Sequence, residues 1–148
     1  MLEEAEWTPP DEFDEYRIVR ELGRGSMGSV YLARDVVLDR PVAMKFLGAL
    51  RPDPAERERF LVEARAIARI QHPNVMSIFR VGEVKGRLYL VTEYIRGQNL
   101  ADLKLPLPWT EVLEIGIGLA RALAAAHRQG VLHRDIKLSN AVIEEGAQ

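Results

Sequence analysis

Three segments of the chain combine residue types that can bind and transfer phosphate. The first is a glycine-rich stretch, G-x-G-x-x-G-x-V, which runs from Gly23 to Val30. Glycines at these spacings let the backbone approach a polyphosphate closely and point N–H groups at it, because no Cβ holds the chain away. A flexible hairpin is the alternative interpretation. A dinucleotide-binding fold would need a helix beginning at Gly28, whereas the residues after it favour a strand.

The second segment is V-A-M-K at residues 42–45, which places a lysine among apolar residues on a predicted strand. A buried ammonium needs a carboxylate partner. Glu63 is expected to supply it, because it lies one turn from both Phe60 and Ile67 on the inward face of a predicted helix. Glu56 falls on the same face and is the second candidate. A solvated surface lysine is the alternative interpretation.

The third segment is H-R-D-I-K-L-S-N at residues 133–140. Asp135 can orient a hydroxyl nucleophile or accept its proton. Lys137 can neutralise a phosphoryl group during transfer, and Asn140 offers a neutral oxygen to Mg²⁺. For H-R-D alone, an ordinary salt bridge between Arg134 and Asp135 is the alternative, but the full octet favours chemistry.

An α+β fold is predicted to position these segments. Short apolar stretches separated by Gly- or Asp-containing turns predict a five-stranded antiparallel sheet, with Lys85 and Gly86 in the turn between the last two strands. The predicted strands are residues 16–22, 29–34, 41–47, 75–84 and 88–94. One helix, residues 55–70, follows a turn and N-cap at 51–54, because its apolar residues recur at helical spacing.

A second predicted helix, residues 109–129, begins the C-terminal part of the chain. Gly130 is expected to cap its end. Gly116 and Gly118 inside it each cost about 1 kcal/mol relative to alanine, so close packing of another segment is expected there. A polar loop and then a short apolar strand are expected over residues 131–143.

Composition limits the classes of function. The 148 residues, of which 47% are apolar, suit about one domain, and no apolar run reaches the roughly 18–20 residues that cross a bilayer. Without cysteine there is no disulfide, thiolate nucleophile or cysteine-based metal site, and three histidines disfavour a histidine cluster. The N-terminus lacks the order of a signal peptide, so a cytoplasmic location is expected.

Charge is unevenly distributed along the chain. Residues 1–15 contain seven acidic residues and no basic one, whereas the remainder carries 15 acidic and 20 basic residues. The segment 1–15 is expected to be a disordered lead-in, in which Pro9 and Pro10 stop any helix. The basic remainder suits an anionic ligand, but it forms no concentrated basic stripe, so neither nucleic acid nor a membrane is an expected partner.

The three segments, together with Glu63 in E-x₈-H-P-N, resemble the motifs of eukaryotic-type serine/threonine protein kinases and are similar to the bacterial members of that family. The motifs occur in family order, and the resemblance covers residues 16 to about 143. It implies a kinase small lobe and hinge over residues 16–95 and the start of the large lobe over residues 96–148. It also implies ATP and Mg²⁺ as ligands and protein serine or threonine hydroxyls as acceptors.

The resemblance further implies a role for each matching residue. Lys45 would contact the α- and β-phosphates with Glu63 as its partner, and Thr92 would be the gatekeeper. Asp135 would be the catalytic base with Lys137 beside it, and Asn140 would bind magnesium. The other implied nucleotide contacts are the glycine-rich loop (Leu22, Gly23, Arg24, Gly25, Ser26, Met27, Gly28, Ser29 and Val30), the purine sandwich (Val30, Ala43 and Val142) and the hinge (Glu93 and Ile95).

The sequence departs from the family pattern at two places. Leu138 stands where these kinases usually have proline, which removes stiffness from the loop but leaves the catalytic side chains in place. The D-F-G motif and activation loop would lie beyond Gln148. The chain is therefore expected to be an incomplete catalytic domain, inactive alone and prone to self-associate through an apolar stripe of Ile115, Leu119 and Leu123. The alternative is a truncated, non-catalytic nucleotide-binding or docking module, and a downstream D-F-G would discriminate between them.

Overall fold

The structure, a computed structural model, describes residues 7–25, 28–48, 51–131 and 141–145. The chain forms two compact units, Met1–Arg57 with Phe79–Tyr94, and Glu58–Ile78 with Ile95–Gln148. Helix α1 (Pro54–Ala68) contributes residues to both. The α+β class is confirmed, and the lobe boundaries at residues 95 and 96 stay a prediction. None of the helices in these ranges is long and apolar enough to span a membrane.

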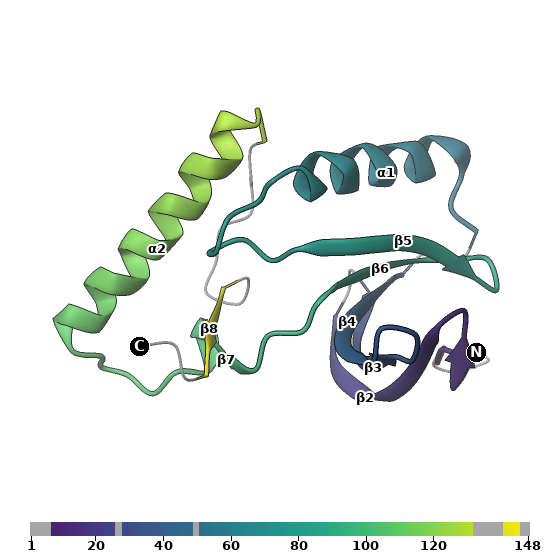
Figure 1. Cartoon of the computed structure of the whole chain (residues 1–148), viewed down its shortest axis with the longest axis horizontal. Helices are drawn as coiled ribbons and strands as arrows, with labels where there is room; N and C mark the ends of the chain where they lie inside the picture. Colours follow the sequence, from purple (N-terminus) through teal and green to yellow (C-terminus); the bar gives the residue numbers. More distant parts are fainter. Residues whose placement is uncertain (1–6, 26–27, 49–50, 132–140, 146–148) are drawn as a thin grey trace, which may run out of the picture. The chain divides into compact units, whose positions relative to one another are not determined.

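The first unit is built on a six-stranded sheet with the strand order β1-β2-β3-β4-β6-β5 (Figure 1). The strands are β1 (Glu12–Phe13), β2 (Tyr16–Gly25), β3 (Gly28–Asp35), β4 (Arg40–Leu47), β5 (Ile78–Val84) and β6 (Arg87–Glu93). All five predicted strands are present. Lys85 and Gly86, with φ of 49° and 77°, form the predicted two-residue turn between β5 and β6.

The two faces of this sheet carry different side chains. One face carries a buried cluster, the aromatic core, which consists of Tyr16, Tyr31, Ala33, Val42, Met44, Phe46, Tyr89 and Val91. Successive strand residues point to opposite faces. The residues between these positions on β3, β4 and β6 therefore lie on the other face, which is where the glycine-rich stretch and V-A-M-K place their candidate contacts.

The N-terminal segment differs from its prediction as a disordered lead-in. In its described part, residues 7–15, Trp7 and Phe13 pack against the aromatic core. Glu12 and Phe13 form β1, which pairs antiparallel with β2. Burying the two rings stabilises this segment in spite of its many carboxylates. The predicted five-stranded sheet therefore has a sixth strand.

The acidic side chains of this segment have partners in the fold. Asp14, with a φ of 51°, lies between β1 and β2, and its carboxylate accepts a hydrogen bond from the Tyr89 hydroxyl. Arg80 on β5 lies 2.5 Å from a carboxylate oxygen of Glu15 and 3.8 Å from one of Asp14. Burial of Tyr89, and then its hydrogen bond to Asp14, raise the pKa of its hydroxyl well above the ordinary value.

Replacing Tyr89 by phenylalanine is expected to lower the free energy of unfolding by about 1–2 kcal/mol, because Asp14 loses its hydroxyl donor while the ring stays packed. This difference in the free energy of unfolding should disappear at alkaline pH. Because the folded-state pKa of Tyr89 is raised above its ordinary value of 10.0, its stabilisation is complete below that pH and is lost as the pH rises above it. Urea unfolding of both proteins at about pH 8 and about pH 11 tests this. An equal difference at the two pH values would contradict it.

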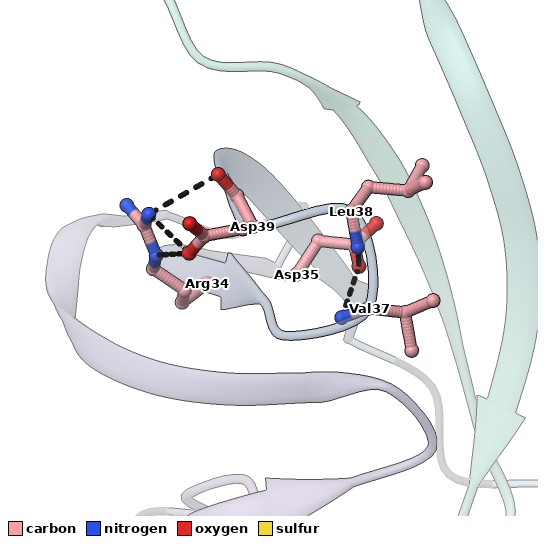
Figure 2. A network of polar contacts seen from close by, with 5 residues as sticks. All are labelled: Arg34, Asp35, Val37, Leu38 and Asp39. Carbon is pink, nitrogen blue, oxygen red and sulfur yellow. Dashed lines mark hydrogen bonds and ion pairs between the residues drawn. The ribbon is translucent and has the colours of Figure 1, made fainter.

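The turn between β3 and β4 holds these strands in register (Figure 2). The buried carboxylate of Asp35 accepts hydrogen bonds from the backbone N–H groups of Val37 at 3.0 Å and Leu38 at 2.9 Å. Across the turn, the Arg34 guanidinium lies 2.6 Å from a carboxylate oxygen of Asp39. The pairing of β3 with β4 then runs from this turn to the glycine-rich loop without a register shift.

The second unit contains most of α1, the long helix α2 and a small two-stranded sheet (Figure 1). Its further elements are β7 (Gly97–Asn99), the 3-10 turn η1 (Leu100–Asp102), α2 (Trp109–Arg128) and β8 (Val142–Glu144). Ile70, just after the end of α1, packs with Ala125 and Ala126 of α2, and Val75 and Val131 lie against them.

Helix α2 ends as the sequence predicts. Gly130 has a φ of 75°, the N–H of Val131 donates to the carbonyl oxygen of Ala126, and the N–H of Gly130 donates to that of His127, both at 3.0 Å. These two bonds form a Schellman motif, in which a glycine takes the left-handed position after the helix. The prediction of Gly130 as the C-terminal cap is confirmed.

Two other expectations for α2 are met only in part. A Cβ on Gly118 would lie 3.4 Å from Nδ2 of Asn74, but no described atom lies within 4 Å of a Cβ on Gly116, and the structure does not explain that glycine. In the expected apolar stripe Leu119 is exposed, whereas Ile115 and Leu123 are half-buried. The large apolar side chains of α2 that are more than half exposed are Trp109, Val112 and Leu113.

Candidate active site

Four of the predicted nucleotide contacts share one face of the six-stranded sheet. Strands β3 and β4 pair Val30 with Lys45, and β4 and β6 pair Ala43 with Thr92. Ala43 and Lys45 are two residues apart on β4, so all four side chains point to the same side. This group, the β-face cluster, lies opposite the aromatic core.

Lys45 is exposed, although its neighbours Met44 and Phe46 are fully buried. Its side chain points away from the aromatic core, so its ammonium group can meet an anion without being buried first. Glu63, its expected partner, is exposed on α1 beside the buried Ala64 and belongs to the second unit. The ion pair between Lys45 and Glu63 stays a prediction.

Glu56, the second candidate for the partner of Lys45, is engaged at the start of α1. Its backbone N–H donates to the Asp53 carboxylate at 2.9 Å, and its own carboxylate accepts from the backbone N–H of Asp53 at 3.3 Å. This reciprocal pair is a capping box, which satisfies N–H groups at a helix start. The capping role favours Glu63 over Glu56 as the partner of Lys45.

The glycine-rich loop joins β2 to β3, and its residues Ser26 and Met27 lie outside the described residues. Gly28 has a φ of 130°, and a Cβ there would lie 2.0 Å from the carbonyl oxygen of Phe46, so the sheet itself requires a glycine. Gly23 is different, since no described atom lies within 4 Å of a Cβ built on it. The packing of the described residues thus explains why residue 28 is glycine, but it does not explain why residue 23 is.

Other loop residues point their side chains away from the β-face cluster. The Arg24 guanidinium binds the Glu21 carboxylate at 2.9 Å and the Tyr31 hydroxyl at 3.2 Å, on the side of the aromatic core. Ser29 pairs with Arg24 and is buried on that same side. For Arg24 and Ser29, which the sequence predicts as nucleotide contacts, only backbone atoms are therefore available to a ligand on the opposite face. Leu22 is exposed, and Gly25 pairs with Gly28 at the end of the hairpin.

The predicted hinge residues follow the β-face cluster along β6. The Thr92 hydroxyl donates to the carbonyl oxygen of Glu93 at 3.2 Å, and Glu93 is the last residue of the strand. Ile95, the next predicted contact, is half-buried and begins the second part of the other unit. The hinge prediction therefore falls on the point where the chain leaves the first unit.

Val142, the predicted purine contact in the C-terminal part, lies on β8 and is 40% exposed. Strand β8 pairs with β7, which sets Val142 opposite Asn99. A Cβ on Gly97 of β7 would lie 1.7 Å from the carbonyl oxygen of Ile143, so this close pairing needs the glycine. Strand β7 was not predicted, because three residues are too few to show strand alternation.

The catalytic candidates Asp135 and Lys137 and the magnesium candidate Asn140 lie outside the described residues, as does the whole octet 133–140. Their roles stay predictions. The described residues on either side of this segment have defined partners: Val131 closes α2, and the carbonyl oxygen of Ala141 accepts a hydrogen bond from the N–H of Leu100 at 2.9 Å. Within the described ranges, no three His, Asp or Glu side chains come together as a metal site.

Comparison with known proteins identifies the family. The family model described as "Protein kinase domain" matches residues 16–148. The chain is 40% identical over 138 residues to the serine/threonine-protein kinase PknJ of Mycobacterium tuberculosis, a match that covers 91% of this chain and 23% of PknJ. It is also 40% identical over 136 residues to the serine/threonine-protein kinase PrkC of Bacillus subtilis, covering 87% of this chain and 20% of PrkC.

A solved structure gives the same result for the fold. The PknI kinase domain of Mycobacterium tuberculosis superimposes with a TM-score of 0.77 at 36% sequence identity, covering 91% of this chain and 57% of that domain. The chain thus spans a fifth to a quarter of the length of these curated relatives. Because the family model matches residues 16–148, nearly the whole length of the chain, the chain belongs to the protein kinase family.

Proposed function

We propose that this chain is the ATP-binding part of a serine/threonine protein kinase. The observation that carries the proposal is the β-face cluster, which sets an exposed lysine and three uncharged side chains on one face of a rigid sheet. Curated relatives of the chain are serine/threonine-protein kinases by name, which supports the same activity.

The β-face cluster fits the two chemically different ends of a nucleotide. Lys45 lies opposite Val30, two residues from the start of β3 at Gly28, so its charge is at the end of the face that adjoins the glycine-rich loop. Ala43 and Thr92 lie one row further, roughly 7 Å away along the strands, at the end that leads to the hinge. A base would contact Ala43 and Thr92 together with Val30, and a polyphosphate would contact Lys45.

The catalytic step would depend on residues of the octet 133–140. Asp135 would accept the proton of a serine or threonine hydroxyl, and Lys137 would neutralise charge on the phosphoryl group as it moves. Asn140 would bind Mg²⁺, which when present offsets the negative charge of the phosphates. Lys45 would hold the phosphates in place, so that the γ-phosphoryl group meets the hydroxyl in line.

The chain is expected to bind MgATP more tightly than adenosine, because the ammonium of Lys45 interacts with the phosphates and not with the base. Isothermal titration calorimetry with each ligand measures the two dissociation constants. Lys45→Met is expected to remove this preference, and Lys104→Met is its control, since Lys104 is an exposed lysine outside the β-face cluster. Equal affinity for MgATP and adenosine would contradict the assignment of Lys45 to the phosphates.

An active kinase domain that contains this chain is expected to place phosphate on serine or threonine. Lys137, two residues after Asp135, matches the serine/threonine class of the family. Autophosphorylation followed by acid hydrolysis and separation of the phosphoamino acids gives a direct answer. Phosphotyrosine as the main product would overturn the acceptor class while leaving ATP binding intact.

A further inference from the structure

Phe46, the residue after Lys45, is where the N-terminal segment meets the sheet. We call residues 7–15 the N-terminal strap. The fully buried ring of Phe46 lies among four aromatic rings, and two of them come from the strap. The centroid distances from Phe46 are 5.2 Å to Trp7, 5.9 Å to Phe13, 5.8 Å to Tyr31 and 5.9 Å to Tyr89.

Arg87 connects the strap to the end of the same strand. Its guanidinium carbon lies 4.3 Å from the centroid of the Trp7 ring, within the range of a cation–π contact. Nη1 of Arg87 donates to the carbonyl oxygens of Leu47 at 3.0 Å and Gly48 at 2.8 Å, which follow Phe46 in the chain. Trp7 therefore has two connections to the end of β4. It packs against the ring of Phe46, and it contacts Arg87, which binds the residues that follow Phe46.

The C-terminal end of the strap is fixed as well. Its residues Asp14 and Glu15 bind Tyr89 and Arg80 on the neighbouring strands, as described above. Tyr89 in turn pairs with Phe46 across β4 and β6. Both ends of the strap are thus attached to residues around Phe46. A segment that only covered an apolar surface would not need these specific polar contacts.

These contacts bear on Lys45 because it shares a peptide unit with Phe46 and points to the opposite face. Packing that fixes Phe46 also fixes the direction in which the side chain of Lys45 leaves the strand. We propose that Trp7 and Phe13 are positioning residues for Lys45, and that the affinity of the chain for MgATP depends on the N-terminal strap. This inference rests on the proposed function, in which Lys45 binds the phosphates.

Trp7→Ala is expected to weaken MgATP binding by about tenfold, because Lys45 would lose part of its charge-assisted contact with the phosphates. Trp7→Phe should restore most of the affinity, because it keeps a ring against Phe46. The measurement is isothermal titration calorimetry of the full chain with MgATP, at a temperature at which unfolding curves show that every variant is folded.

A double-mutant cycle with Lys45→Met separates positioning from general stabilisation. If Trp7 acts through Lys45, Trp7→Ala has no further effect on MgATP affinity once Lys45 is methionine. Ile18→Ala is the matched control, since Ile18 packs against the same aromatic core from β2 and contributes no ring. It is expected to lower the stability of the chain while changing the dissociation constant for MgATP by less than about twofold.

The outcomes distinguish this inference from the proposed function. Equal weakening by Trp7→Ala with Lys45 present or replaced would overturn the inference alone, because the strap would then stabilise the sheet without acting through the lysine. An equally large effect of Ile18→Ala would also overturn it. If the parent chain binds no MgATP, the proposed function fails and this inference fails with it.

Discussion

Replacing Lys45 by methionine is expected to lower phosphoryl transfer by about two to three orders of magnitude in an active kinase domain that contains this chain. Methionine has a similar length but no charge, so it removes the interaction with the phosphates and little else. Because Lys45 is exposed, the free energy of unfolding should change by less than about 0.5 kcal/mol. Transfer of radiolabelled phosphate from ATP and urea unfolding measure the two quantities.

The matched control for this prediction is Lys104→Met, which removes an exposed lysine outside the β-face cluster. It should leave both phosphoryl transfer and stability unchanged. A Lys45→Met variant that transfers phosphate as fast as its parent would identify Lys45 as an ordinary surface charge, which is the alternative that the sequence allows.

The second large effect is expected at Gly28, and it concerns stability. In Gly28→Ala the new Cβ would meet the carbonyl oxygen of Phe46 at 2.0 Å, in a backbone conformation that L-residues rarely adopt. We expect a loss of about 3 kcal/mol or more in the free energy of unfolding, because β3 and β4 must move apart to admit the methyl group. Denaturant unfolding measures it.

Gly23→Ala is the matched control, because the same methyl group there meets no described atom within 4 Å. Its expected cost in stability is small, whereas its expected effect is weaker MgATP binding, since a Cβ holds the backbone away from the phosphates. If Gly28→Ala is as stable as Gly23→Ala, the close approach of the loop to Phe46 does not exist in solution.

Much of the sheet and both helices follow from the sequence, because each has a local signal. Alternating apolar residues mark β3 and β4, and Gly86 marks the tight turn with Lys85, because glycine takes a positive φ without steric cost. Gly130 marks the end of α2 for a similar reason. The chemistry-bearing motifs are local too, so the sequence could name Val30 and Lys45 before their pairing was known.

The N-terminal strap shows what local signals cannot supply. Residues 1–15 were predicted to be disordered because they are strongly acidic. That prediction did not take account of the two large rings, Trp7 and Phe13, which pack against the aromatic core. A signal was available, since disordered segments are poor in aromatic residues. The partners of the strap, Phe46 and Tyr89, are far away in the sequence, so its destination required the structure.

Glu56 shows the opposite limit, in which a correct pattern has two interpretations. Its helical spacing matches an inward face, but D-x-x-E at residues 53–56 is also a capping box, and the structure shows the cap. Two residues of the same type on one predicted face cannot be separated by periodicity alone. The hydrogen bonds of Asp53 separate them.

The strand order of the first unit has a consequence for how the chain folds. Strands β2, β3 and β4 are neighbours both in sequence and in the sheet, whereas β4 pairs with β6 through residues 43 to 51 positions apart, such as Phe46 and Tyr89. Closing the longer loop costs more chain entropy. The row that joins Val30 to Lys45 can therefore form early, from local hairpins, while the row that joins Ala43 to Thr92 must await the long-range pairing. A folding intermediate that stops at β4 would carry Lys45, Val30 and Ala43 but would lack Thr92 and the hinge residues that follow it.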